Sequence, residues 1–123
     1  MNHQASKKVK SYNFGLFAES LAALFLNLQG YRILERRYKT HLGEIDLVAK
    51  RGRNLVFIEV KARKKKETSE VLSQHQMNRI SKAGLLFLAK NNEFEDYFIR
   101  FDLIIMRPFS WPEHFKNAWE CRQ

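Results

Sequence analysis

Apolar residues recur at helical spacing in two segments of the chain. In residues 12–29 they follow intervals of three and four, which predicts an amphipathic helix with one buried stripe: Phe14, Phe17, Ala18, Leu21, Leu24, Phe25 and Leu28. Gly30 follows, at the position where a helix is commonly capped. A second helix is predicted from about Gln76 to Lys90, with Asn91 at its end.

Four other segments have the apolar pattern of β-strands. They cover residues 31–38, 45–49, 55–62 and 98–106, and the second and third are rich in Val and Ile. Residues 50–54 predict a hairpin connection between those two strands, with Gly52 available for a positive φ. Near the C-terminus, a short helix is predicted around residues 115–120.

The order of these elements is α-β-β-β-α-β, which is typical of a small mixed α/β domain. The pattern therefore predicts a single domain over residues 12–123, preceded by a flexible basic arm over residues 1–11. If the third and fourth strands are parallel neighbours, the second helix forms a right-handed crossover between them.

The amino-acid composition restricts the number of domains, the binding partners and the cellular compartment that are expected. A length of 123 residues allows one domain, and 45% apolar residues exclude a chain that is disordered throughout. The 22 Lys and Arg residues outnumber the 13 Asp and Glu residues, and the net charge of +9 favours nucleic acid first and an anionic membrane surface second. A single cysteine, Cys121, excludes an internal disulfide framework and fits the reducing cytoplasm. Glu19 breaks the apolar run that follows the basic start, and the uninterrupted part, residues 21–26, is too short to span a bilayer. A soluble cytoplasmic protein without a membrane partner is therefore expected.

The third predicted strand carries charged residues on one of its two faces. Side chains alternate along a strand, so Glu59 and Lys61 share a face. The other face is entirely apolar and is predicted to be core: Val56, Ile58, Val60 and Ala62.

The hairpin places two carboxylates opposite each other. A two-residue turn at positions 52–53, with Gly first, pairs residues whose numbers sum to 105, so Asp46 lies opposite Glu59 and Glu44 opposite Lys61. Opposed carboxylates repel, and a hard divalent cation held by their oxygens, such as Mg²⁺, relieves that repulsion. A plain cross-strand ion pair of Lys61 with Asp46 or Glu44 is the alternative.

Glu19, on the first predicted helix, is a third acidic candidate. Its helical neighbours are small or apolar: Gly15, Ala22, Ala23 and Leu26. A carboxylate in such surroundings is costly unless it is paired or bound to a ligand. Glu19 is therefore part of a site, the partner of a nearby arginine, or an exposed residue at the edge of the stripe.

The remaining polar and aromatic residues favour structural interpretations. No metal-ligand spacing relates the four histidines, so each is predicted at the surface: His3, His41, His75 and His114. Asp102 is predicted to make a structural contact, and Trp111 and Trp119 to anchor packing.

Residues 43–49 (GEIDLVA) and 56–63 (VFIEVKAR) together resemble the YraN family of small bacterial proteins. The resemblance continues in Ala18-Glu19 upstream and in Arg79-Ile80 and residues 100–102 downstream, so it covers nearly the whole chain after the arm. That family is similar to the PD-(D/E)XK nuclease superfamily, closest in style to archaeal Holliday-junction resolvases.

The resemblance implies a restriction-endonuclease-like α-β-β-β-α-β core, with a mixed sheet flanked by helices. It also implies roles for matching residues. Asp46 and Glu59 are ligands of Mg²⁺ or Mn²⁺, Lys61 is the active-site lysine, and Glu19 is an additional acidic residue from the first helix.

The main functional hypothesis is a metal-dependent endonuclease that hydrolyses DNA, with branched or structured DNA suggested by analogy with resolvases. Basic residues would bind backbone phosphates without reading sequence: Arg36, Arg37, Arg63, Lys64, Lys65 and Lys66. Resolvases act as two-fold dimers, so a homodimer is a further hypothesis.

Two other functions are compatible with the sequence. A non-catalytic nucleic-acid-binding module with a nuclease fold is favoured by Gln76-Met77, where the family commonly has Lys-Gln. An adaptor at a membrane surface or on a protein partner has only the net charge in its favour.

Overall fold

The computed structural model describes the backbone of residues 3–64 and 72–120, and the side chains of these ranges from Phe14 onward. The elements follow the order α1 (His3–Leu28), β1 (Arg32–Lys39), β2 (Glu44–Arg51), β3 (Asn54–Ala62), α2 (Gln74–Lys90), the 3₁₀ helix η1 (Asn92–Phe94), β4 (Phe98–Met106) and β5 (Glu113–Trp119). In the described ranges, no helix combines the length and apolar content needed to cross a bilayer.

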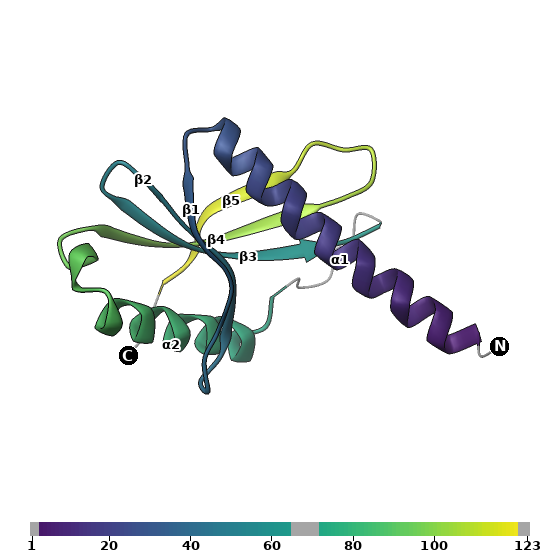
Figure 1. Cartoon of the computed structure of the whole chain (residues 1–123), viewed down its shortest axis with the longest axis horizontal. Coiled ribbons are helices and arrows are strands. Elements are labelled where there is room, and N and C mark those ends of the chain that lie inside the picture. The colour runs from purple at the N-terminus through teal and green to yellow at the C-terminus, as the bar shows by residue number, and fades with distance from the viewer. Residues whose placement is uncertain (1–2, 65–71, 121–123) are drawn as a thin grey trace.

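The five strands form one mixed sheet in the order β1-β2-β3-β4-β5 (Figure 1). Strands β3 and β4 are parallel, and every other neighbouring pair is antiparallel. Parallel strands cannot be joined by a hairpin turn, and helix α2 lies in the longer connection between β3 and β4. The predicted single mixed α/β domain and its α-β-β-β-α-β order are confirmed.

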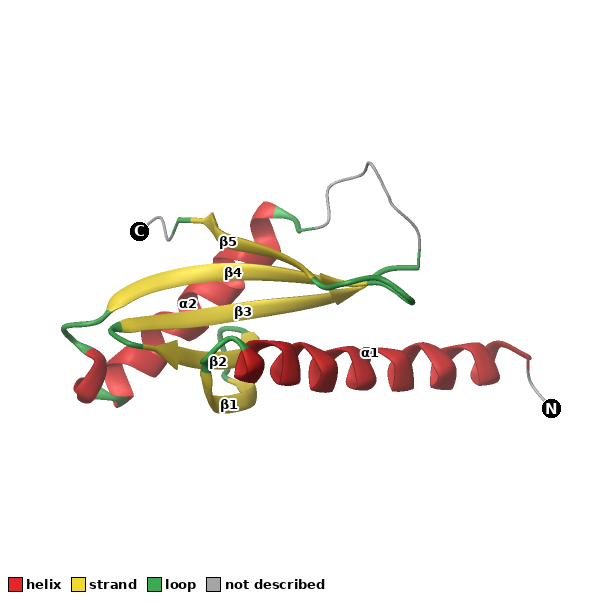
Figure 2. Cartoon of the chain, turned by 90° about the horizontal axis from the view of Figure 1, so that it is seen from above, coloured by secondary structure: helices red, strands yellow, loops and turns green. Residues whose placement is uncertain are grey.

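The two long helices lie on opposite faces of the sheet (Figure 2). Small side chains of α1, among them Ala18 and Ala22, pack with Val56 and Ile58 of β3. On the other face, Phe87 of α2 and its neighbours pack around Phe57 and the flanking strands. Strand β3 is therefore covered on both faces, which explains its nearly continuous apolar sequence.

The buried side of α1 differs from the predicted stripe. The sheet covers Ala18, Ala22, Ala23 and Leu26, whereas four larger members of the prediction are exposed: Phe17, Leu21, Leu24 and Leu28. Residues 14–28 are apolar on both sides of the helix, so periodicity alone did not select the buried side. Helix α1 also begins at His3 and not at Tyr12, because residues 3–11 contain no proline or glycine that would end a helix. That residues 1–11 form a separate flexible arm stays a prediction.

The C-terminal segment is also corrected. Residues 113–119 form strand β5 and not the predicted short helix, because β4 offers a backbone edge with which they pair. Trp119 is buried, as predicted, and its Nε1 donates a hydrogen bond to Ser81 Oγ at 3.1 Å. Trp111 is 87% exposed, so its predicted role as a packing anchor is wrong.

The turn between β1 and β2 depends on a glycine. Gly43 lies so close to the backbone of Arg79 in α2 that a Cβ atom would overlap the Arg79 carbonyl. Gly43→Ala is therefore expected to lower the free energy of unfolding by about 1–3 kcal/mol, because neither backbone can move without disturbing the packing of α2.

Gly15→Ala is the matched control, because nothing lies within 4 Å of the added Cβ. In a helix this change is expected to be neutral or to stabilise by up to about 1 kcal/mol. Chemical unfolding of both variants measures the difference, and equal stabilities would contradict the close approach at Gly43.

Candidate functional site

The β2–β3 hairpin sets the positions of the predicted acidic residues. Gly52 has a φ of 61°, as a turn with Gly first requires. The pairs run from Leu47↔Ile58 to Arg51↔Asn54, and each pair sums to 105. The register that was predicted to bring Asp46 opposite Glu59 is therefore confirmed over this part of the ladder.

The regular β2–β3 ladder ends at the pair Leu47↔Ile58, directly before Asp46 is reached. The Val60 N–H donates a hydrogen bond to Asp46 Oδ2 at 2.8 Å, so a side-chain oxygen takes the place of a backbone acceptor. Ile45 packs on the α2 side of the sheet and Leu47 on the α1 side, although residues two apart in a regular strand share a face. Asp46 lies at this irregularity, and its carboxylate is held by the backbone of the neighbouring strand.

The neighbouring strand β1 is distorted at the same level. Arg37 lies between the pairs Arg36↔Leu47 and Tyr38↔Ile45, which places it opposite Asp46. Its φ is 53°, a left-handed conformation that non-glycine residues rarely adopt. Such strained backbone is held by its surroundings and is concentrated at functional sites.

Asp46 and Glu59 are adjacent, partly buried carboxyl groups. Burial raises the pKa of Asp46 to about 9, and the negative charge of Glu59 adds to the increase. Burial also raises the pKa of Glu59, although the hydrogen bond with Asp46 and the charge of Lys61 oppose that change. Ionising both groups at once is therefore costly, because it would place two negative charges side by side.

The predicted active-site lysine lies beside this pair. Lys61 Nζ is 3.7 Å from Glu59 Oε1, and both side chains are largely buried. The structure thus brings Asp46, Glu59 and Lys61 together. The ion pair that Lys61 makes is with Glu59 on its own strand, and not across the hairpin.

Glu19 reaches the same place from α1 but has a different partner. A cleft of about 320 Å³ is lined by residues that include Glu19, Arg37, Lys39, Glu44, Asp46 and Glu59, and we call it the acidic cleft. Glu19 Oε2 accepts a hydrogen bond from Arg37 Nε at 2.9 Å, which confirms the alternative that Glu19 pairs with a nearby arginine. Among the described side chains, those of residues 14–64 and 72–120, no three acidic, His or Cys residues are grouped so as to hold a metal ion.

The predicted phosphate-binding residues fall into two places. Arg36 and Arg37 are on β1, and Arg36 donates to Ser20 Oγ of α1 at 2.9 Å. Arg63 and the exposed Lys64 follow directly after β3. Lys65 and Lys66 lie outside the described residues. Lys39, which lines the acidic cleft, was missed, although its pairing with Glu44 at the β1–β2 turn places it there.

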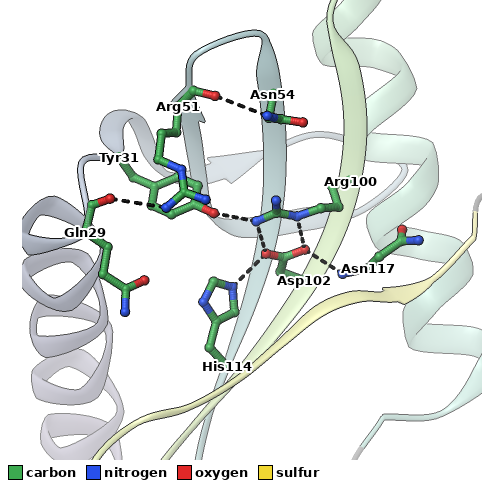
Figure 3. Close-up of polar contacts among 8 residues, drawn as sticks. All are labelled: Gln29, Tyr31, Arg51, Asn54, Arg100, Asp102, His114 and Asn117. Atoms are coloured by element: carbon green, nitrogen blue, oxygen red, sulfur yellow. Dashed lines mark hydrogen bonds and ion pairs between the residues drawn. The ribbon is translucent and has the colours of Figure 1, made fainter.

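A buried polar network on β4 and β5 was largely missed (Figure 3). Asp102 is completely buried and accepts hydrogen bonds from Arg100, from His114 Nε2 at 2.6 Å and from the Asn117 N–H. Arg100 also donates to the Tyr31 hydroxyl at 2.6 Å. Burial alone would favour the neutral acid, but the bonds from His114 and Arg100 hold the pKa of Asp102 below its usual value.

The structural role predicted for Asp102 is confirmed, whereas the surface position predicted for His114 is wrong. His114 lies on strand β5 and contacts Asp102 of the neighbouring strand β4, and only 7% of the His114 side chain is exposed. Asp102 itself was the signal in the sequence that pointed to a buried partner such as His114, because a carboxylate inside an apolar strand requires buried partners.

Comparison with known proteins places the chain among related sequences. A model described as "Uncharacterised protein family UPF0102" matches residues 18–106. A UPF0102 protein of Parvibaculum lavamentivorans is 44% identical over 110 residues, which are 89% of this chain and 83% of that protein. Another, from Mesorhizobium japonicum, is 40% identical over 119 residues, which are 96% of this chain and 95% of that protein.

A solved structure shares the fold. Hjc of Archaeoglobus fulgidus, described as a Holliday junction resolvase, superimposes with a TM-score of 0.56 over 83% of this chain and 71% of its own. The two sequences are 22% identical, so the likeness establishes a common fold and nothing finer.

Proposed function

The chain belongs to the uncharacterised protein family UPF0102, the family that its motifs resemble under the name YraN, and from this membership and its site we propose that it is a metal-dependent nuclease. Its substrate is a phosphodiester bond of DNA. The net charge of +9 and the fold shared with a Holliday junction resolvase support a nucleic-acid substrate, with branched or structured DNA as the preferred shape. A single cysteine is consistent with work in the cytoplasm.

The observation that carries the proposal is the pair of adjacent carboxyl groups, Asp46 and Glu59, with Lys61 beside them. Burial raises the pKa of both acids, so the full negative charge of the pair is costly unless a cation balances it. Carboxylate oxygens are the donors that Mg²⁺ and Mn²⁺ prefer, so the residues present fit such an ion. Asp46 and Glu59 would hold it, and Glu19 would join them if it exchanged its bond with Arg37.

Each residue of the site has a defined task in this proposal. Asp46 and Glu59 would hold a divalent ion, whose chemistry would be activation of the attacking water and neutralisation of charge on the scissile phosphate. The Lys61 ammonium stabilises the negative charge that develops on the phosphate oxygens. Arg36, Arg37, Arg63 and Lys64, together with Lys65 and Lys66, bind flanking phosphates and orient the DNA.

A second candidate is a nucleic-acid-binding module that cuts nothing. The observation that favours it is the Glu19–Arg37 pair, which leaves two acidic residues together in place of three. Such a module is expected to lose affinity for DNA with increasing salt and to be indifferent to chelators.

Calorimetry and cleavage assays on three variants separate metal binding from catalysis. Glu59→Gln is expected to abolish binding of Mg²⁺ and Mn²⁺, because it removes a charged ligand. Lys61→Met is expected to keep metal affinity within a few fold but to slow cleavage about 100-fold or more, because only charge stabilisation is lost. Glu35→Gln, an exposed change on β1, is the control and is expected to alter neither quantity.

Cleavage is measured on branched, duplex and single-stranded DNA, with Mg²⁺ and with a chelator. If the parent protein binds DNA but neither binds metal nor cuts any substrate, the nuclease proposal is wrong and the binding module takes its place.

A further inference from the structure

Helix α1 has apolar side chains on both sides, and the sheet covers only one of them. The side against the sheet is at most 7% exposed at Ala18, Ala22, Ala23 and Leu26. The opposite side carries four residues that we call the outer stripe, with exposed fractions of 60%, 37%, 53% and 81%: Phe17, Leu21, Leu24 and Leu28. A helix that is apolar all round is ordinarily buried, so a cover for the outer stripe is expected.

The outer stripe continues onto the loop between β4 and β5, which Figure 1 shows beside α1. A groove of about 520 Å³ separates them, with Phe17 and Leu21 on one wall and Phe109 and Trp111 on the other. Both of these loop aromatics are almost fully exposed. The six side chains together present on the order of 800 Å² of apolar surface, more than the ~300–600 Å² of the largest patch on a typical monomer.

The charge pattern argues against a polyanion as the cover. Residues 14–28 contain no Lys or Arg, although the chain has 22, and Glu19 is their only charged residue. Nucleic acids and anionic membranes are bound by surfaces rich in cationic side chains. The outer stripe therefore fits an apolar protein surface.

The spacing of the outer stripe indicates which protein surface. Intervals of four, three and four residues form the seam along which two helices pack. We infer that the outer stripe is the interface of a symmetric homodimer, in which α1 packs antiparallel against α1 of a second copy. In a two-fold dimer the same patch of each copy forms the interface, and a stable interface buries about 800 Å² of each copy.

The two-fold axis places Leu21 and Leu24 at the centre of this interface. Phe17 of one copy then meets the partner's Leu28, which enters the groove beside Trp111. The acidic cleft uses other residues of α1, Gly15 and Glu19, so dimerisation leaves it open. The inference does not depend on the proposed nuclease activity and stands even if no metal binds.

Sedimentation velocity of the full chain between about 1 and 100 μM tests the interface. The parent protein is expected to sediment as a dimer of the 14.7 kDa chain. Leu24→Glu is expected to raise the dimer dissociation constant at least ~100-fold, because it places a charge at the centre of the interface in both copies. Leu85→Glu is the matched control, since Leu85 on α2 is 42% exposed but lies outside the patch, and this variant is expected to remain a dimer.

Circular dichroism melting checks that Leu24→Glu is folded. If it is not, Leu28→Glu replaces it, because Leu28 is 81% exposed and its substitution does not disturb the core. A monomeric parent protein at 100 μM, or a dimer that survives both changes, would overturn the inference. If the parent is monomeric and Leu24→Glu abolishes its binding to anionic vesicles or to DNA, the surface belongs to that partner.

Discussion

Replacing Asp46 by asparagine is expected to abolish metal-dependent cleavage and to stabilise the metal-free protein. Cleavage is expected to fall by about three orders of magnitude or more, because the change removes a charged ligand and the charge stabilisation that depends on the bound ion. The hydrogen bond from the Val60 N–H at 2.8 Å is retained, because the amide oxygen of asparagine can also accept it. The fold around the site is therefore preserved.

The gain in stability depends on pH. Burial raises the pKa of Asp46 to about 9, whereas the unfolded chain releases this proton near its ordinary value of about 4. Between these values the folded protein binds more protons than the unfolded chain, so the stability of the parent protein falls as pH rises. Asp46→Asn removes this loss and is expected to be more stable than the parent protein by about 1–3 kcal/mol at pH 8, with a smaller difference at pH 5. The effect is limited to this size because Asp46 is partly exposed and solvent screens its charge.

Thermal unfolding with and without Mg²⁺ measures both effects. The parent protein is expected to gain stability from Mg²⁺, because a ligand that binds the folded state shifts the equilibrium toward it, and Asp46→Asn is expected to gain none. Glu35→Gln is the control, since Glu35 is exposed on β1 and does not line the acidic cleft. A metal-free Asp46→Asn protein that is less stable than the parent at pH 8 would contradict the assigned electrostatics.

Asp102→Asn is expected to destabilise the sheet strongly. Asp102 is the only charged residue among the fully buried side chains of the described ranges, and its carboxylate holds Arg100, His114 and the Asn117 backbone together. Removing its charge leaves the Arg100 guanidinium without a counter-ion in a mostly buried position, and breaking a buried ion pair costs about 3–5 kcal/mol. For a domain of this size, the melting temperature is expected to fall by roughly 10–20 °C.

Glu120→Gln is the control for Asp102→Asn. It removes one carboxylate directly after β5, where Glu120 is exposed. Substitutions of exposed residues usually change stability by about 0.5 kcal/mol or less, so this variant is expected to unfold within a few degrees of the parent protein. Equal melting temperatures for the two variants would show that the network of Figure 3 adds no net stability.

The sequence by itself determined the elements whose signals are local. Val- and Ile-rich runs on either side of Gly52 were sufficient to predict the hairpin and its register, because a two-residue turn leaves one pairing of the strands. Strand β4 was predicted with the observed boundaries, residues 98–106, from its apolar run. The same local reasoning predicted that Asp46, Glu59 and Lys61 lie close together. Their roles as metal ligands and active-site lysine stay predictions.

The tertiary structure alone decided what depends on residues distant in sequence. The sheet selects the alanine side of α1 because small side chains allow a close approach, and periodicity could not distinguish that side from the outer stripe. Glu19 bonds to Arg37, 18 residues away, and His114 reaches Asp102 through β5, a strand that forms because β4 offers an edge. Side-chain partners and sheet edges of this kind exist only after the chain has folded, so no pattern of neighbouring residues encodes them.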